Sequence, residues 1–128
     1  MTGQVQNDNL LLPVPVRVPG QPPLTLEFVI DTGFTGYLTL PEAAVNALGL
    51  DFLRRMPANL ADDSTITLSV YALLIVWHGQ EQEVEVLATG RRPLLGTLLL
   101  RETCLSADWT SGGLVEVVPL SQEDAGIG

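Results

Sequence analysis

The chain has 128 residues, the length of one ordinary domain, and 46% of them are hydrophobic against 16% that are charged. This composition forms a core and excludes an intrinsically disordered chain. The formal net charge is −9, and all six basic residues are arginines. The lack of lysine excludes lysine Schiff-base chemistry and a P-loop, and the acidic balance argues against a nucleic-acid partner.

One cysteine (Cys104) and one histidine (His78) cannot provide the four nitrogen or sulfur ligands of a structural zinc site. The longest apolar run, residues 70–77, is far shorter than the roughly 20 residues that a membrane-spanning helix needs. Residues 1–9 carry no pattern of a signal peptide. We therefore expect a soluble, cytoplasmic protein that binds no membrane and holds no structural zinc.

The first predicted elements form a β-hairpin. Residues 1–9 are polar and are expected to be a loose terminus. Alternating valines over residues 14–18 indicate a strand, and its prolines favour an edge or a subunit interface. The turn at 19–23 is followed by a second alternating strand that ends at Ile30.

The middle of the chain combines one short helix with further strands. Pro41, Glu42 and the alanines after them predict a helix over about 41–48 that stops at Gly49. Residues 51–60 have no clear pattern. A strand over 65–77 is then joined to the next strand by a turn at 78–81.

The last predicted elements are a short helix and a hairpin. The helix is expected within 97–102, and strands at 104–109 and 114–118 flank the sequence Thr-Ser-Gly-Gly. Leu114–Val118 is, like residues 14–18, a candidate interface strand. Residues 121–128 are polar and expected to be loose. The pattern predicts a single mostly-β domain over residues 10–120, a closed barrel or sandwich with one or two short helices.

Two short segments are candidates for an active site. The first is Asp31-Thr32-Gly33, which places a carboxylate at the end of a buried strand. Taken alone it is equally an Asx turn, and by composition it arises in roughly a few per cent of chains of this length. The second is Leu94-Leu95-Gly96-Thr97, which alone reads as a strand end followed by a helix start. Neither segment defines a function by itself.

Together these segments resemble the clan of aspartic proteases that includes the retroviral proteases, and most closely its small prokaryotic branch, in which phenylalanine follows Asp-Thr-Gly. The order and spacing fit over about residues 14–119. The matching segments are Phe28–Gly36, Leu38–Pro41, Ala61–Ser64, Leu94–Leu99 and Gly112–Val117.

The resemblance implies a closed, mostly-β, retropepsin-like acid-protease barrel. It implies that Asp31 is the catalytic carboxylate, that the Thr32 hydroxyl hydrogen-bonds to a partner subunit's matching loop, and that Gly33 lets the backbone pass close to the carboxylates. Two further groups would support the loop and form a flap over the substrate. These groups are Leu94, Leu95 and Gly96 for the support, and Ala61, Asp62, Asp63 and Ser64 for the flap.

The chemistry of these proteases needs two carboxylates. One takes a proton from the attacking water, and the other donates a proton to the peptide carbonyl oxygen. Two carboxylates about 3 Å apart cannot both ionise, so the pair shares one proton, as is known for aspartic proteases. Asp-Thr-Gly occurs once in this chain. The resemblance therefore implies a homodimer that supplies one Asp31 from each subunit and cleaves peptide or protein substrates without a cofactor.

Two features depart from the retroviral pattern. Phe34 stands where those enzymes have a small residue, and the flap tip contains Asp62 and Asp63 but no glycine. Two alternatives stay open: a non-catalytic binding or regulatory module on the retropepsin-like fold, and a β-barrel interaction protein with a chance motif.

Overall fold

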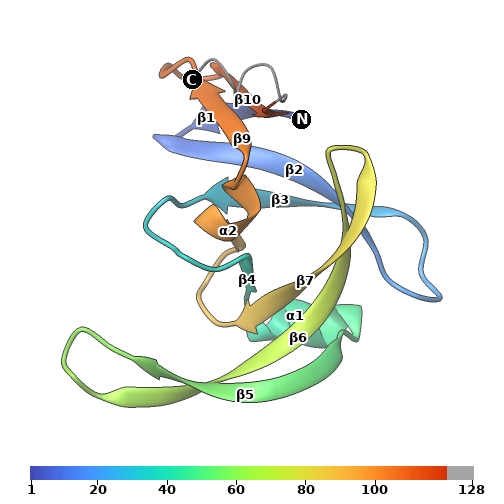
Figure 1. Cartoon of the computed structure of the whole chain (residues 1–128), viewed down its shortest axis with the longest axis vertical. Coiled ribbons are helices and arrows are strands. Elements are labelled where there is room, and N and C mark those ends of the chain that lie inside the picture. Colours follow the sequence, from blue (N-terminus) through green and yellow to red (C-terminus); the bar gives the residue numbers. More distant parts are fainter. Residues whose placement is uncertain (121–128) are drawn as a thin grey trace.

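The computed structural model describes residues 1–120 and consists mainly of strands, with two short helices (Figure 1). The elements in chain order are β1 (Thr2–Gln6), β2 (Asn9–Arg17), β3 (Leu24–Ile30), β4 (Leu38–Leu40), α1 (Glu42–Leu48), β5 (Asp51–Asn59), β6 (Thr65–Trp77), β7 (Gln80–Ala88), β8 (Leu94–Leu95), α2 (Thr97–Leu100), β9 (Thr103–Ala107) and β10 (Leu114–Pro119). Neither helix is long and apolar enough to cross a membrane, among the residues described.

All ten strands belong to one sheet, in the order β5-β6-β7-β4-β8-β3-β2-β1-β10-β9. A further pairing joins β2 to β6, at Val16–Ile75 and Arg17–Leu74, and closes the six strands from β6 to β2 into a ring. The prediction of a mostly-β closed fold with one or two short helices is confirmed. The free edges of the sheet are β5 and β9.

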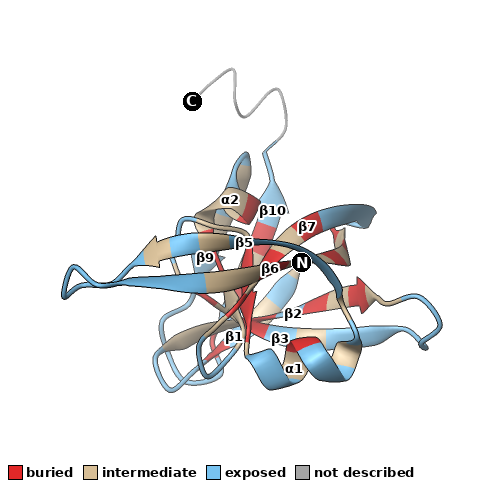
Figure 2. Ribbon diagram, turned by 90° about the horizontal axis from the view of Figure 1, so that it is seen from below, coloured by how far each residue is buried: buried red, intermediate tan, exposed pale blue. Residues whose placement is uncertain are grey.

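The core lies inside this ring and follows the alternation of the strands. Leu12, Val14 and Val16 of β2 are fully buried, and Phe28 and Ile30 of β3 are buried beside them. Figure 2 shows the same pattern along the strands, whereas the tip of the β5–β6 hairpin is exposed along both of its strands. Burying one face of each strand fixes its register, because a slip of one residue would turn the apolar side chains outward.

The predicted hairpins are present. β2 pairs with β3 from Leu11–Val29 to Val16–Leu24, and β6 pairs with β7 up to Trp77–Gln80. The turn of the second hairpin consists of His78 and Gly79, and both have positive φ angles (51° and 78°). Such a two-residue turn matches the twist of the strands that it connects.

The structure corrects the expectation for the N-terminus. Residues 1–9 were predicted to be loose, but residues 2–6 form β1, which lies between β2 and β10. In β1 only Val5 is buried, and its neighbours Gln4 and Gln6 are exposed. A strand with one inward residue has almost no apolar alternation, so its pairing with β2 and β10 determines its structure. The tail at 121–128 lies outside the described residues.

Residues 14–18 and 114–118 were predicted to be interface strands, but the structure pairs most of them within the chain. β10 lies between β1 and β9, and β2 has β3 on one side and both β1 and β6 on the other. Pro13 and Pro15 fall between the segments of β2 that pair with β1 and β6, so β2 has a single neighbour there. Proline is tolerated at such a position because no backbone donor is needed on the open side.

Candidate active site

Asp31 follows directly after the buried end of β3. β3 pairs in parallel with β8, and the register places Val29 opposite Leu94 and Ile30 opposite Leu95. The backbone N–H of Asp31 donates to the carbonyl of Leu95 at 2.9 Å. The Asp31 side chain is half-buried. Two strands that meet inside the core therefore fix the carboxylate at the surface of the ring.

The turn after Asp31 holds one oxygen of its carboxylate. The backbone N–H of Gly33 donates to Asp31 Oδ1 at 2.9 Å, and the N–H of Phe34 donates to the Asp31 carbonyl at 3.1 Å. A Cβ at Gly33 would lie 3.2 Å from Asp31 Oδ1, which is tighter than an ordinary contact. The small residue lets the backbone approach the carboxylate closely enough to donate a hydrogen bond.

The side chain of Thr32 is exposed next to Asp31. Within residues 1–120 its hydroxyl has no hydrogen-bond partner. The role that the sequence resemblance implies for Thr32, a hydrogen bond to the matching loop of a second subunit, stays a prediction.

The Leu94-Leu95-Gly96 segment supports the loop from the core side. Leu95 is fully buried, and Gly96 donates its N–H to the carbonyl of Tyr37 at 2.9 Å. A Cβ on Gly96 would lie 2.3 Å from the Gly36 carbonyl oxygen, so no other residue fits at 96 without a shift of the backbone. The structure thus brings together Asp31 and this segment, which are far apart in the sequence.

Two threonines to which the sequence analysis gave no role of their own strengthen this support. Thr39 is only 3% exposed, and its Oγ1 accepts a hydrogen bond from the N–H of Leu94 at 3.2 Å. Thr97 donates its N–H to the carbonyl of Phe34 at 2.9 Å. A threonine next to a predicted strand end has no sequence signal of its own, because its partner is about 60 positions away in the chain.

The predicted flap residues form the turn between β5 and β6. They are all exposed, and the turn closes with a hydrogen bond from the N–H of Leu60 to the carbonyl of Ser64 at 2.8 Å. Asp62 Oδ1 accepts hydrogen bonds from the Ser64 hydroxyl and from its N–H, the latter at 3.0 Å. These bonds hold the pKa of Asp62 below its ordinary value. Asp63 has a left-handed φ of 66°, a conformation that aspartate tolerates better than most residues.

The described residues contain one ion pair, which ties the β5–β6 hairpin to its neighbour β7. Arg54 of β5 donates to both oxygens of Glu85 of β7, at 2.7 and 2.8 Å, across the intervening β6. The hydrogen bonds from Arg54 lower the pKa of the Glu85 carboxyl, and they raise the pKa of the Arg54 guanidinium. The pair lies at the base of the hairpin, and the tip beyond it is held by local contacts only.

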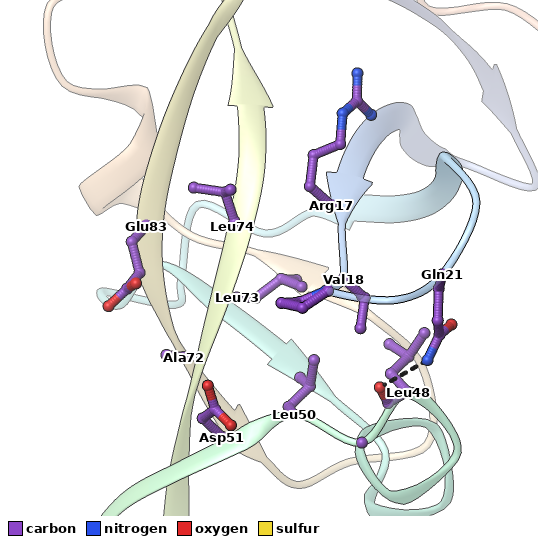
Figure 3. Close-up of a pocket in the computed structure, with 12 residues that line it drawn as sticks. Arg17, Val18, Gln21, Leu48, Leu50, Asp51, Ala72, Leu73, Leu74 and Glu83 are labelled. Atoms are coloured by element: carbon purple, nitrogen blue, oxygen red, sulfur yellow. Dashed lines mark hydrogen bonds between the residues drawn. The ribbon is translucent and has the colours of Figure 1, made fainter.

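A cavity of about 350 Å³ lies on another part of the ring, between α1, the β2–β3 turn and the base of the β5–β6 hairpin (Figure 3). Leu50 and Leu73 line it together with the charged side chains of Arg17, Asp51 and Glu83. None of the residues predicted for the active site lines this cavity. Residues 1–120 also contain no group of three or more histidine, cysteine or acidic side chains able to hold a metal ion.

Comparison with known proteins identifies the fold. Neither a family model nor a curated protein sequence matches the chain. Among solved structures, the chain is similar to a retropepsin-like aspartic protease from Rickettsia conorii, with a TM-score of 0.58 and 19% identity over 93% of this chain and 92% of that one. It is also similar to the simian foamy virus (mac) protease, with a TM-score of 0.49 and 23% identity over 70% of this chain and 91% of that one. The similarity to the Rickettsia structure, which covers nearly the whole of both chains, shows that the protein has a retropepsin-like fold.

Proposed function

We propose that the protein is an aspartic endopeptidase that acts as a homodimer, with one Asp31 from each subunit. The proposal rests on the hydrogen-bonded loop that holds Asp31. Its carboxylate is half-buried at the end of a core strand, its backbone is bonded to Leu95, and one of its oxygens is held by Gly33. A carboxylate positioned in this way on a retropepsin-like fold suits activation of a water molecule.

The second carboxylate comes from a second copy of the chain in this proposal. Asp-Thr-Gly occurs once in the sequence, and in residues 1–120 the only hydrogen bond to the Asp31 carboxylate is that from Gly33. A two-fold axis beside the loop would place the two Asp31 side chains together, where they share one proton. The ionised member then takes a proton from water, and the protonated member donates to the carbonyl oxygen of the peptide.

Other residues have supporting roles in the proposed enzyme. Thr32 would hydrogen-bond across the two-fold axis, and Leu94, Leu95 and Gly96 would hold the loop in place. The turn of Ala61, Asp62, Asp63 and Ser64 would close over an extended substrate and exclude water. In Figure 1 this turn and the loop after β3 lie on the same side of the view. We assign the activity to residues 10–120 together with β1, without a cofactor, and we keep the cytoplasm as its expected location.

The central experiment replaces Asp31 with asparagine and follows cleavage of an unfolded protein substrate from pH 4 to pH 8. Asp31→Asn keeps the shape of the side chain but removes its ability to ionise, so we expect cleavage to fall by at least about 1000-fold while sedimentation still detects a dimer. Asp8→Asn, in the exposed β1–β2 turn, is the matched control and should cleave like the parent. Cleavage by Asp31→Asn at the parental rate would rule out the mechanism.

A mixing experiment tests the shared site directly. When equal amounts of parent and Asp31→Asn subunits are refolded together, only parental homodimers hold two aspartates. We expect about one quarter of the parental activity per total subunit, because the two chains combine at random. An activity of about one half would indicate that each chain carries a complete site by itself.

The alternative is a binding or regulatory module on the same fold. A single exposed Asp-Thr-Gly loop is inert without its partner. A chain that remains a folded monomer at high micromolar concentration, and cleaves nothing, would favour this alternative.

A further inference from the structure

Phe34 is the residue at which this chain departs from the retroviral pattern, and its ring is held between two glycines. A Cβ built on Gly36 would lie 2.6 Å from Cζ and 2.7 Å from Cε1 of the ring. A Cβ built on Gly96 would lie 2.6 Å from Cδ2 of the same ring. Side-chain atoms do not approach this closely, so the ring fills the space that a side chain at either position would take.

The two glycines belong to the two segments that form the site. Gly36 ends the loop that begins at Asp31, and Gly96 separates β8 from α2. Two backbone hydrogen bonds also join these segments: the N–H of Thr97 donates to the Phe34 carbonyl at 2.9 Å, and the N–H of Leu98 donates to the Gly36 carbonyl at 3.2 Å. The half-buried ring therefore packs at the junction of the loop and the start of α2.

The ring is also connected to the carboxylate by the turn itself. The N–H of Phe34 donates to the carbonyl of Asp31, and the intervening Gly33 donates to Asp31 Oδ1. A shift of Phe34 thus moves the donor that orients the carboxylate. Misplacement of a reacting group by about 1 Å can reduce a rate about 100-fold.

We propose that Phe34 is a positioning residue, whose ring, packed between Gly36 and Gly96, locks the Asp31 loop onto the start of α2 and so fixes the Asp31 carboxylate. The catalytic part of this inference rests on the proposed function, whereas the packing part does not. The ring then explains the glycine at 36, whereas the glycine at 96 is required both by the ring and by the nearby backbone oxygens of Gly36 and Phe34.

A double-substitution cycle tests the packing without any activity assay. The three atoms nearest to a methyl group at position 36 all belong to the Phe34 ring, so we expect the thermal midpoint of Gly36→Ala to fall by about 5–15 °C. Phe34→Leu removes Cε1, Cε2 and Cζ but keeps Cδ2. The double variant Phe34→Leu/Gly36→Ala should therefore melt within about 2 °C of Phe34→Leu alone.

Two controls test whether the recovery of thermal stability in the double variant is specific to the contact between Phe34 and Gly36. Phe52→Ala removes an exposed ring from β5, and it should not rescue Gly36→Ala. Gly96→Ala should not be rescued by Phe34→Leu, because its methyl group also meets the backbone oxygens of Gly36 and Phe34. The proposal is overturned if Gly36→Ala has the same thermal midpoint as the parent. It is also overturned if Gly36→Ala lowers the midpoint as much in the presence of Phe34→Leu as it does alone.

The positioning role is tested on folded variants, well below their midpoints. Hydrogen exchange of the Gly33 amide should become about 10-fold faster in Phe34→Ala and remain parental in Phe52→Ala. If the protein cleaves peptides, kcat should fall about 10–100-fold in Phe34→Ala and less in Phe34→Leu, with KM little changed. The pH range of activity should also narrow, because a displaced pair of carboxylates shares its proton less strongly.

These measurements keep the two proposals distinguishable. A parent that cleaves nothing, with the midpoints and the Gly33 exchange as expected, would end the protease proposal and leave the packing role intact. A parental exchange rate and a parental kcat in Phe34→Ala would refute the positioning role, whatever the activity of the enzyme.

Discussion

The Asp31 loop and the turn at residues 61–64, the predicted flap, are both short connections between strands, yet they are stabilised in opposite ways. The loop is held by long-range backbone bonds, such as those of Gly96 and Thr97 to residues before β4, and it packs against fully buried Leu95. The turn from Ala61 to Ser64 is exposed, and its bonds reach no further than its own hairpin.

Because of this difference, we expect the two regions to tolerate substitutions unequally. A loop that is fixed by distant segments presents its carboxylate in one geometry, but a single added methyl group disturbs it. A turn that is fixed by its own residues can move as a unit without loss of core packing. Substitutions in the loop should therefore reduce stability strongly, and substitutions in the turn should have small effects on stability.

The largest effect is expected for Gly96→Ala. Its methyl group would lie 2.3 Å from the Gly36 carbonyl oxygen and 2.7 Å from that of Phe34, and backbone cannot rotate away as a side chain can. We expect a loss of about 3 kcal/mol or more in the free energy of unfolding, measured by urea denaturation. Gly36→Ala, which meets only a side chain, should lose less. An equal loss in the two variants would contradict the difference between backbone and side-chain contacts.

A smaller loss is expected for Thr39→Val. The change keeps the shape of a side chain that is 3% exposed, but it removes the hydrogen bond that Thr39 Oγ1 accepts from the N–H of Leu94. Loss of one such hydrogen bond costs about 0.5–1.5 kcal/mol, which equilibrium unfolding resolves. Thr25→Val, at an exposed position of β3, is the control and should change stability little. If the two variants are equally stable, the hydrogen bond to β8 does not support the loop.

In the flap turn, Asp63 is the most informative position. Because its φ is 66°, Asp63→Gly should fold with unchanged or slightly higher stability, and Asp63→Val should lose about 1–2 kcal/mol. Thermal denaturation of the two variants measures the difference. A parental midpoint for Asp63→Val would mean that the turn readily adopts another conformation.

The smallest effect concerns the ion pair at the base of the hairpin. The pKa of Glu85 is lowered below its ordinary value of 4.5 by its hydrogen bonds with Arg54, so the pair stabilises the fold above that value and loses its effect as the pH falls through the lowered pKa. Glu85→Gln should therefore be slightly less stable than the parent at pH 7, and the two should converge at acid pH. Because both side chains are exposed and screened, 1 M salt should also remove the difference.

The sequence predicted the elements whose apolar pattern is strong. The alternation up to Ile30 predicted β3 and placed Asp31 at its end, and the Pro41 signal predicted α1 to within a residue. The chain from 51 to 60 had no clear pattern because β5 is a free edge that reaches out from the ring. Arg54 and Arg55 are exposed there, as are Phe52 and Leu53, so no alternation marks a buried face.

The site was predicted less completely than the fold. Asp31, Gly33 and Gly96 were singled out, and the structure brings them together, whereas their catalytic roles stay proposals. The role of Thr39 could not be predicted, because it depends on the register between β4 and β8, which no local pattern encodes. Phe34 was noticed as a match to the small prokaryotic branch and as a departure from the retroviral pattern, but its packing could not be predicted, since it depends on two glycines in different segments.

The parallel pairing of β3 with β8 has a consequence for the order of folding. The loop after β3 is bonded to the start of α2 through Phe34 and Thr97, and these two residues are 63 positions apart in the chain. Contacts with such separation form late and slowly, on about the millisecond-to-second time scale, because the chain loses much entropy before they form. During synthesis, the Asp31 loop therefore cannot be completed until the chain beyond Leu100 has left the ribosome. Any activity of the proposed enzyme would therefore begin only after this later segment has been made.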